Sequence, residues 1–389
     1  MYKHESPIFV ASPLLPELSA VEERLKQIWD SKWLTNIGPQ HKELESALRQ
    51  HLRVPELSLF CNGTIALLTA GKALNLSGEV ITTPFSFAAT PHSLSWMGVD
   101  LVFGDIDPHT LNLLPEAIER AITPRTTGIM ATHVFGTPCD VEAIEDIAKR
   151  HNLKVVYDGA HAFGLEVNNR GIGSYGDITM YSFHATKLFH TVEGGALSCQ
   201  DPDMKQHIDM LKNFAIRNEE EVFGIGINGK LNEVQAAIGL SVLSVMDKER
   251  TRRVRIYDIY KEVLTGVAGL EMVKIPDAVT RRSLQYMPVL VRKSEARLSR
   301  NELHTALKEY NIITRKYFHP LCTQYDCYKD LPSAAPDQIP NATRIGSECL
   351  ALPYYGSLKD EEAYNIAEVI RHLLSSPMNQ KPYDLARAC

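Results

Sequence analysis

Short apolar runs alternate with helical patterns over the first half of the chain. The runs have the length of strands and lie at 57–61, 79–82, 100–104, 127–132, 154–158, 178–182 and 195–199. Between the earlier runs, apolar residues recur at helical spacing over 65–73, 90–97, 114–121 and 141–150. Strands that alternate with helices favour a parallel, doubly wound α/β sheet. Because the runs after residue 158 follow one another too closely for intervening helices, we expect mixed pairing there.

The rest of the chain is predicted to form flanking helices and a second, smaller domain. Helical patterns cover 18–31 and 41–52 before the first strand, and a long helical stretch covers 231–263. A strand at 285–291 and helices at 300–310 and 360–374 follow. The tail from Pro377 is expected to be poorly ordered. We predict a large α/β domain over 1–245 and a small α+β domain over 246–389.

Composition removes several functional classes. The 389 residues are 44% hydrophobic and 23% charged, which is typical of a globular chain of about two domains. A net charge of −6 offers no basic field, so we expect no nucleic-acid binding. We also expect no membrane span and no signal peptide, because no apolar run has the required length. Seven irregularly spaced cysteines predict free thiols, no metal site and a cytoplasmic location.

Two glycine-rich segments have the spacing of a dinucleotide-binding loop but not its context. Such a loop follows a buried strand and opens a helix. The segment at 171–176 follows a turn and precedes a strand, and the segment at 224–229 follows a run of glutamates. Both are better interpreted as turns, which leaves a dinucleotide oxidoreductase as a remote alternative.

Lys187 and Asp158 are candidates for one type of cofactor chemistry. Lys187 lies between two apolar runs, and a desolvated lysine is a nucleophile for carbonyls such as that of pyridoxal 5′-phosphate. Asp158 ends a predicted strand, at the edge where open α/β sheets bind ligands. Pyridoxal phosphate chemistry requires a carboxylate at the pyridine nitrogen. Taken singly, Lys187 is better explained as an ordinary loop lysine, and Asp158 could equally cap a turn.

Two further groups follow other predicted strands. Gly63 and Thr64 open a helix, whose free N–H groups form an anion site. Phe87 lies in the segment 84–90 and could stack on a flat ring. A helix cap without a ligand and a core phenylalanine are the ordinary alternatives. Because all four groups lie at strand ends and suit the same cofactor, together they favour pyridoxal phosphate.

These motifs resemble those of the DegT/StrS-type nucleotide-sugar aminotransferases, which are pyridoxal-phosphate-dependent enzymes of fold type I. The resemblance runs from Trp33 to Tyr355 and rests on the segments 33–39, 62–64, 84–90, 158–161, 182–187, 193–195 and 228–237. It implies a large domain with a mostly parallel seven-stranded sheet and a smaller α+β C-terminal domain.

The resemblance also implies roles for single residues. Lys187 would bond covalently to the cofactor and move the proton during amino transfer, and Asp158 would pair with the pyridine nitrogen. His161 stands where the family often has glutamine, near the cofactor's 3′-oxygen. The other implied cofactor contacts are Gly63, Thr64, Ile65 (through its backbone), Phe87, Ser182 and, from the neighbouring subunit, Asn228. The implied substrate contacts are Thr35, Asn36, Tyr317 and His319.

The implied function is transamination of a nucleotide-linked keto-deoxysugar, with L-glutamate as amino donor. The chain looks most like enzymes that aminate C4 of dTDP-4-keto-6-deoxyglucose. The alternatives are a C3-aminotransferase, an enzyme for a UDP- or GDP-linked sugar, and a non-catalytic regulatory or binding protein of this fold. Related dehydratases carry histidine at the position of Lys187, so the lysine favours amino transfer. The contact of Asn228 with a neighbouring cofactor would make the enzyme a homodimer with shared active sites.

Overall fold

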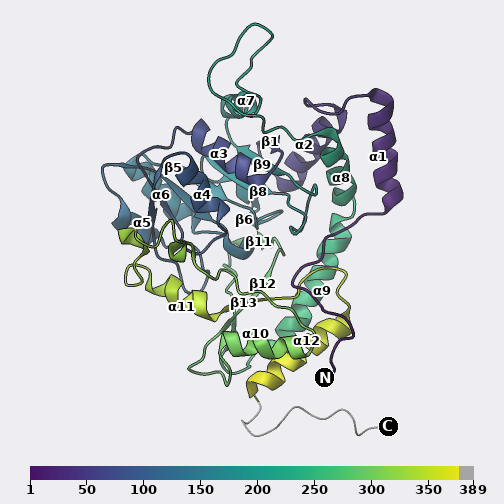
Figure 1. Cartoon of the computed structure of the whole chain (residues 1–389), viewed down its shortest axis with the longest axis vertical. Helices are drawn as coiled ribbons and strands as arrows, with labels where there is room; N and C mark the ends of the chain where they lie inside the picture. The colour runs from purple at the N-terminus through teal and green to yellow at the C-terminus, as the bar shows by residue number, and fades with distance from the viewer. Residues whose placement is uncertain (376–389) are drawn as a thin grey trace.

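A computed structural model describes residues 1–375, and its centre is a mostly parallel sheet flanked by helices (Figure 1). Within this range the sheet has seven strands, in the order β1-β9-β8-β5-β4-β2-β3. They are β1 (Glu56–Phe60), β2 (Glu79–Thr82), β3 (Asp100–Phe103), β4 (Thr126–Thr132), β5 (Lys154–Asp158), β8 (Ile178–Ser182) and β9 (Gly195–Cys199). Only β9 is antiparallel to its neighbours, β1 and β8. The predicted α/β fold and the mixed pairing after residue 158 are therefore confirmed.

The two faces of the sheet belong to different hydrophobic clusters. Along β5, Val155 and Tyr157 pack in one cluster and Val156 in the other, as expected for a strand buried on both faces. Helices α2, α6 and α8 complete the first cluster, and α3, α4 and α7 complete the second. The helices of this part are α1 (Leu18–Ser31), α2 (Pro39–Leu52), α3 (Gly63–Ala73), α4 (Ala89–Trp96), α5 (Pro115–Ala121), α6 (Val141–His151), α7 (Pro202–Leu211) and α8 (Glu233–Leu243).

The C-terminal part has its own antiparallel sheet and helices. The sheet runs β10 (Leu270–Met272), β12 (Met287–Val291), β13 (Cys349–Leu352). The helices are α9 (Met246–Leu264), α10 (Arg300–Glu309), α11 (Pro340–Glu348) and α12 (Asp360–Ser375). One hydrophobic cluster joins α9, α10, α12 and the sheet, and it also takes in Ile8 from the N-terminal segment. A short strand, β11 (Val279–Arg281), pairs with β6 (Glu166–Val167), which in turn pairs with β7 (Arg170–Gly171).

The predicted helical stretch at 231–263 is two helices, with a break at Ser244 and Val245. Val245 has φ −107° and ψ 4°, which lies outside the range of an α-helix and interrupts it. Helix α8 packs on α1 and α2, whereas α9 packs on α12, so the break lets each helix meet its own neighbours. We keep the predicted domain boundary after residue 245 as a proposal on this ground. The expectation for the tail from Pro377 lies outside the described residues.

Two further observations bear on the sequence-based expectations. The cysteines among residues 1–375 are all free thiols. None of the helices described is both long enough and apolar enough to cross a membrane.

Candidate active site

The carboxyl ends of β1, β5 and β8 lie at one edge of the central sheet. Strand β9 lies between β1 and β8. Its first residue, Gly195, pairs with Phe60 at the end of β1 and with Ser182 at the end of β8. Strand β5 lies on the other side of β8 and runs parallel to it. The fold therefore brings the segment 62–64, Asp158 and the loop that carries Lys187 to the same edge.

A cavity of about 320 Å³, the size of a small-molecule site, opens at this edge. Most of the predicted site residues line it, namely Gly63, Thr64, Phe87, Asp158, His161, Ser182, Lys187 and Tyr317. Other lining residues include Asn62, Ser86, Thr132, Glu193, Tyr286, Arg315 and Phe318. Because Tyr286, Arg315 and Tyr317 come from the C-terminal part, the cavity lies between the two parts of the chain.

Asp158 is a buried carboxylate at the floor of this site, with 3% of its surface exposed. Its Oδ1 accepts a hydrogen bond from the Ala160 N–H at 3.0 Å, and its Oδ2 accepts one from the Thr90 hydroxyl at 2.6 Å. Burial raises the pKa of the Asp158 carboxyl group, and the Thr90 hydrogen bond acts in the opposite direction. Within residues 1–375, no ion pair includes Asp158.

A chain of buried hydroxyl groups leads to Asp158. The Thr132 hydroxyl donates to Ser86 Oγ at 3.0 Å, and Ser86 Oγ lies 2.8 Å from Thr90 Oγ1. Since the one hydroxyl proton of Thr90 points to Asp158, Ser86 must be the donor to Thr90. Each hydroxyl in the chain thus directs its proton toward the carboxylate and stabilises its charged form.

Lys187 lies in the loop after β8, half-buried, with its amine toward the cavity. Burial lowers the pKa of the Lys187 ammonium group, while the negative charge of Asp158 acts in the opposite direction. The lower pKa increases the fraction of free amine, which is the nucleophilic form. Its Nζ lies 5.9 Å from the centre of the Tyr286 ring.

His161 presents an uncharged donor to the same cavity. Its Nδ1 accepts a hydrogen bond from the Phe135 N–H at 3.3 Å, so the proton of the neutral ring lies on Nε2. The rings of Phe135 and Phe318 lie nearly parallel to it, at centroid distances of 6.2 and 6.0 Å. Burial, together with the charge of Lys187, holds the pKa of His161 well below its usual range.

The start of α3 supplies donors for an anion. The Asn62 side chain caps this helix by accepting a hydrogen bond from the Ile65 N–H at 2.8 Å. The N–H groups of Gly63 and Thr64 have no acceptor within the helix. A Cβ atom on Gly63 would come within 3.2 Å of Ser182 Cβ, so a larger residue would press on β8. With the hydroxyls of Thr64 and Ser182, these N–H groups can bind a phosphate.

A second hollow of about 370 Å³ opens beside the first. It shares Phe87, Arg315, Tyr317 and Phe318 with the cavity and adds Lys316, His319, His304 and Tyr325. Burial lowers the pKa of His319, so the positive charges here belong to Arg315 and Lys316. His319, a predicted substrate residue, lies in this hollow and not in the first cavity.

Some predicted residues lie away from the cavity or already have a partner. Thr35 and Asn36 are exposed in the loop between α1 and α2, and Asn228 is exposed in the loop after α7. All three lie outside both hollows. The Ile65 N–H, a predicted phosphate donor, is bonded to Asn62 within the chain.

No role was predicted for Tyr286 or Thr90. Tyr286 lines the cavity beside Tyr317, a predicted substrate residue, and the centroids of the two rings lie 5.4 Å apart. Thr90 lies within the segment 84–90 that carries the family resemblance, which was the available signal. Tyr286 carried no such signal, because its segment resembles an ordinary strand start.

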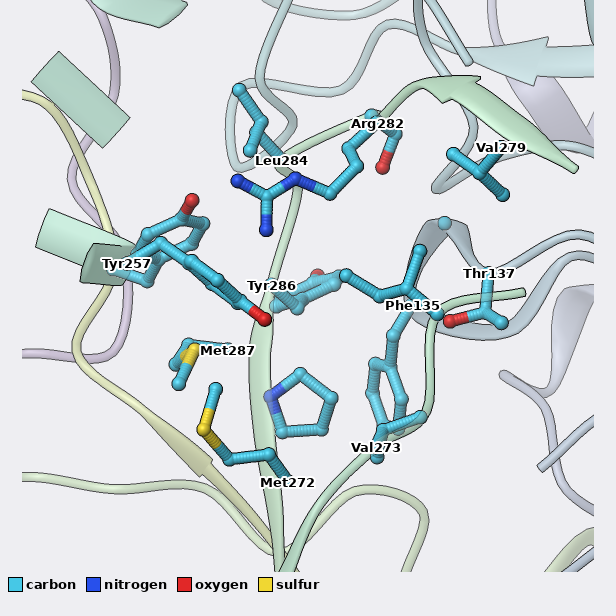
Figure 2. Close-up of a pocket in the computed structure, with 15 residues that line it drawn as sticks. Phe135, Thr137, Tyr257, Met272, Val273, Val279, Arg282, Leu284, Tyr286 and Met287 are labelled. Atoms are coloured by element: carbon cyan, nitrogen blue, oxygen red, sulfur yellow. The ribbon is translucent and has the colours of Figure 1, made fainter. Parts of the chain in front are cut away.

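Another cavity, of about 60 Å³, lies on the other side of Tyr286 (Figure 2). The rings of Phe135, Tyr257 and Tyr286 and the side chains of Met272 and Met287 surround it. It has about a fifth of the volume of the cavity that holds Lys187, and neither Lys187 nor Asp158 lines it, so we interpret it as a packing gap between the two parts of the chain rather than a reaction site.

The residues of the main cavity fit pyridoxal phosphate. Asp158 is a buried carboxylate with no direct ion pair among residues 1–375, and a protonated pyridine nitrogen would supply one. Lys187 offers an amine of lowered pKa, and the start of α3 offers donors for a phosphate. Phe87, 61% exposed, borders both hollows and can cover a flat ring.

Comparison with known proteins gives consistent matches over almost the whole chain. Residues 18–371 match the model of the DegT/DnrJ/EryC1/StrS aminotransferase family. A dTDP-4-amino-4,6-dideoxy-D-glucose transaminase of Shigella dysenteriae is 45% identical over 95% of this chain and 100% of its own length. An enzyme of the same name from Escherichia coli is 41% identical over 94% of this chain and 99% of its own. The crystal structure of DesI, determined in the presence of its TDP-sugar product, superposes with a TM-score of 0.90 at 33% identity, covering 95% of this chain and 94% of that one.

Proposed function

The chain belongs to the DegT/DnrJ/EryC1/StrS aminotransferase family, and from that premise we propose that it aminates C4 of dTDP-4-keto-6-deoxyglucose. The chain is a sugar aminotransferase. The dTDP-linked substrate is proposed from the names of its relatives at 45% and 41% identity. We propose L-glutamate as the amino donor and pyridoxal phosphate as the cofactor. The observation that carries the proposal is that Lys187 and the buried carboxylate of Asp158 face one cavity.

Each residue of the cavity has one task in this proposal. When bound, pyridoxal phosphate supplies an electron sink for the breaking C–H bond. Asp158 would hold a proton at the pyridine nitrogen, and its hydroxyl chain keeps the carboxylate charged. Lys187 would hold the cofactor through Nζ and, once released as a free amine, would move a proton from the donor carbon to the cofactor carbon. His161, whose ring proton lies on Nε2, would donate a hydrogen bond to the cofactor's ring oxygen.

The second hollow suits the nucleotide part of the substrate. A dTDP-sugar carries a diphosphate between its sugar and its nucleoside. Arg315 and Lys316 supply two positive charges in the hollow that borders Lys187's cavity. Phe87 and Tyr325 supply aromatic surface for the sugar or the base. We propose that Tyr317 and His319 contact the sugar and the phosphates from this side.

The proposal includes a homodimer with shared sites. The loop between α7 and α8 extends from the body of the protein, at the top of the view (Figure 1). Its side chains Val222, Phe223 and Ile225 are 66%, 55% and 82% exposed. An apolar loop of this kind is typical of a contact surface. We propose that it docks on a second copy and that Asn228 reaches the phosphate site of that copy. Thr35 and Asn36 would likewise meet the substrate only in the dimer.

A cytoplasmic location is part of the proposal. Six thiols form no disulfide, namely those of Cys61, Cys139, Cys199, Cys322, Cys327 and Cys349. Free thiols persist in a reducing compartment such as the cytoplasm.

Product analysis tests the substrate. The purified protein is incubated with pyridoxal phosphate, L-glutamate and, in separate reactions, dTDP-, UDP- or GDP-4-keto-6-deoxy sugars. We expect a product only or mainly from the dTDP-sugar. Its mass should be that of the amino sugar, and its proton NMR spectrum should place the nitrogen at C4. Faster turnover of a UDP- or GDP-sugar, or nitrogen at C3, would select one of the alternatives instead.

A further inference from the structure

Gln285 is a buried polar residue whose side chain contacts both neighbours of Lys187. Its Oε1 accepts a hydrogen bond from the Leu188 N–H at 2.6 Å, and its Nε2 donates to the Thr186 carbonyl at 3.3 Å. The residue is 3% exposed. A side-chain amide can donate and accept at the same time. One side chain therefore bonds the backbone on either side of the reactive lysine.

The other hydrogen bonds around Lys187 are local. The Lys187 N–H donates to the His184 carbonyl at 2.8 Å, and the Thr186 N–H donates to His184 Nδ1 at 3.2 Å. These bonds shape the turn but do not tie it to the rest of the protein. Gln285 comes from the C-terminal part and provides such a tie.

The backbone at Gln285 is itself held by α9. Nη1 of Arg253 donates to the carbonyls of Leu284 and Gln285, at 3.1 and 3.3 Å. Nε of Arg253 donates to Glu249 Oε1 at 2.6 Å, and both side chains are buried. Either charge would be costly to bury without the other, so the pair resists displacement. Gln285 therefore stands on a rigid support.

The residues on both sides of Gln285 line a second space, and Tyr286 also borders the cavity that holds Lys187. Leu284 and Tyr286 line the small cavity shown in Figure 2, while the amide of Gln285 reaches the Lys187 loop. The segment thus packs into the apolar gap through its neighbours and meets the lysine loop through Gln285.

We propose that Gln285 is a positioning residue that fixes the backbone around Lys187 and aims its amine at the cofactor. The inference rests on the proposed function, because it concerns the same lysine. Without the amide, the Leu188 N–H and the Thr186 carbonyl lose their partner and the loop can shift. A displacement of about 1 Å at a reacting group can cost about a hundredfold in rate.

Covalent capture of the cofactor measures this positioning without turnover. Cofactor-free protein is mixed with pyridoxal phosphate, reduced with borohydride at timed intervals, and analysed by intact mass and peptide mapping. Gln285→Met keeps the length of the side chain and removes both backbone hydrogen bonds. Gln40→Met is the matched control, because buried Gln40 also accepts one side-chain hydrogen bond, from Arg24, and donates one, to Gln27.

We expect Gln285→Met to label Lys187 at least about tenfold more slowly than the parent across the pH range, since the defect is one of geometry. Gln40→Met should label at the parent rate, although both variants lose thermal stability. Gln285→Glu retains the acceptor for Leu188, so an intermediate rate is expected; it provides the test if Gln285→Met does not fold. If folded Gln285→Met labels Lys187 at the parent rate, the positioning role of Gln285 is wrong while the proposed function still stands. Absence of label at Lys187 in the parent, with Lys187→Ala as baseline, overturns the proposed function with it.

Discussion

Asp158 and Lys187 face one cavity, and burial shifts the pKa of each group toward its uncharged form. It raises the pKa of the carboxyl group and lowers that of the ammonium group, so each is less charged than at the surface. A cation bound beside Asp158 would lower the pKa of its carboxyl group again. A ligand carbonyl could form a covalent bond with the free amine of Lys187. The two residues are thus prepared for a ligand that supplies both a positive nitrogen and a carbonyl.

Replacing the lysine should abolish catalysis. Lys187→Ala removes the nucleophile and the group that moves the proton, and general acid–base catalysis alone contributes about 10²–10⁴-fold. We expect 2-oxoglutarate formation from L-glutamate to fall by at least about a thousandfold. Lys149→Ala, at an exposed position on α6, is the control and should react as the parent does. Substantial turnover by Lys187→Ala would reject the role of this lysine.

Asp158→Asn should lower turnover and change how stability depends on pH. An amide cannot hold the pyridine proton by charge, so we expect a loss of about 10²–10³-fold. The folded-state pKa of Asp158 is raised, so its contribution to stability is present below the unfolded pKa of about 3.9 and is lost as pH rises through the folded value.

Thermal melts of the cofactor-free protein between about pH 4 and pH 8 measure this second effect. As the pH rises, the melting temperature of Asp158→Asn should increase relative to that of the parent. A constant difference would show that Asp158 is not the buried charge described above, and turnover within a few-fold of the parent would make it a structural residue.

At the residue scale, sequence reasoning found the side chains that lie in short motifs and missed those that arrive from far along the chain. Thr90 meets Asp158 across 68 positions, and Gln285 meets Leu188 across 97. No local pattern encodes such contacts. The family resemblance assigned the Ile65 N–H to the phosphate, but the capping by Asn62 depends on a side-chain orientation that the sequence does not give.

At the scale of elements, the predicted strands agree closely with those observed because each is a short apolar run buried on both faces. The bounds Lys154–Asp158 and Gly195–Cys199 coincide with the prediction. The prediction of one long helical stretch over 231–263 was wrong, because the helical spacing continues across the break at Val245. Helices α8 and α9 are separate because they pack on different neighbours. Strand β13 was missed because it follows α11 without a turn signal.

The N-cap of α3, formed by the side chain of Asn62, can be tested by substitution. Asn62→Ala removes the side chain that accepts from the Ile65 N–H, which should lower the free energy of unfolding by about 1 kcal/mol. The loosened first turn should also bind the cofactor phosphate less well. Denaturant unfolding measures the first effect and a titration with pyridoxal phosphate the second. Asp140→Ala, at the start of α6, is the matched control and should lower stability alone. Equal cofactor affinity in the two variants would contradict the role of this cap.

At the scale of the whole molecule, one chain builds the floor and walls of the cavity but leaves an apolar loop without a partner. Phe223 and Ile225 are 55% and 82% exposed, and the loop stands clear of the body (Figure 1). Asn228, at the base of this loop, is exposed and outside the cavity of its own chain. If this loop completes the phosphate site of a second copy, each active site needs two chains, whereas an ordinary intrachain turn would leave every site self-sufficient.

Mixing two inactive variants separates these possibilities. Lys187→Ala lacks the nucleophile, and Asn228→Asp would place a negative charge beside the neighbour's phosphate, so each homodimer should be nearly inactive. In a hybrid dimer, the site that keeps Lys187 receives the native Asn228 from the other chain and becomes complete. Random exchange makes about half the dimers hybrid, so up to about a quarter of all sites should regain activity. Exchange is verified by mass spectrometry of differently tagged chains, and the size of the active species by light scattering. If exchange is complete and no activity returns, or if a monomer is active, the sites are not shared.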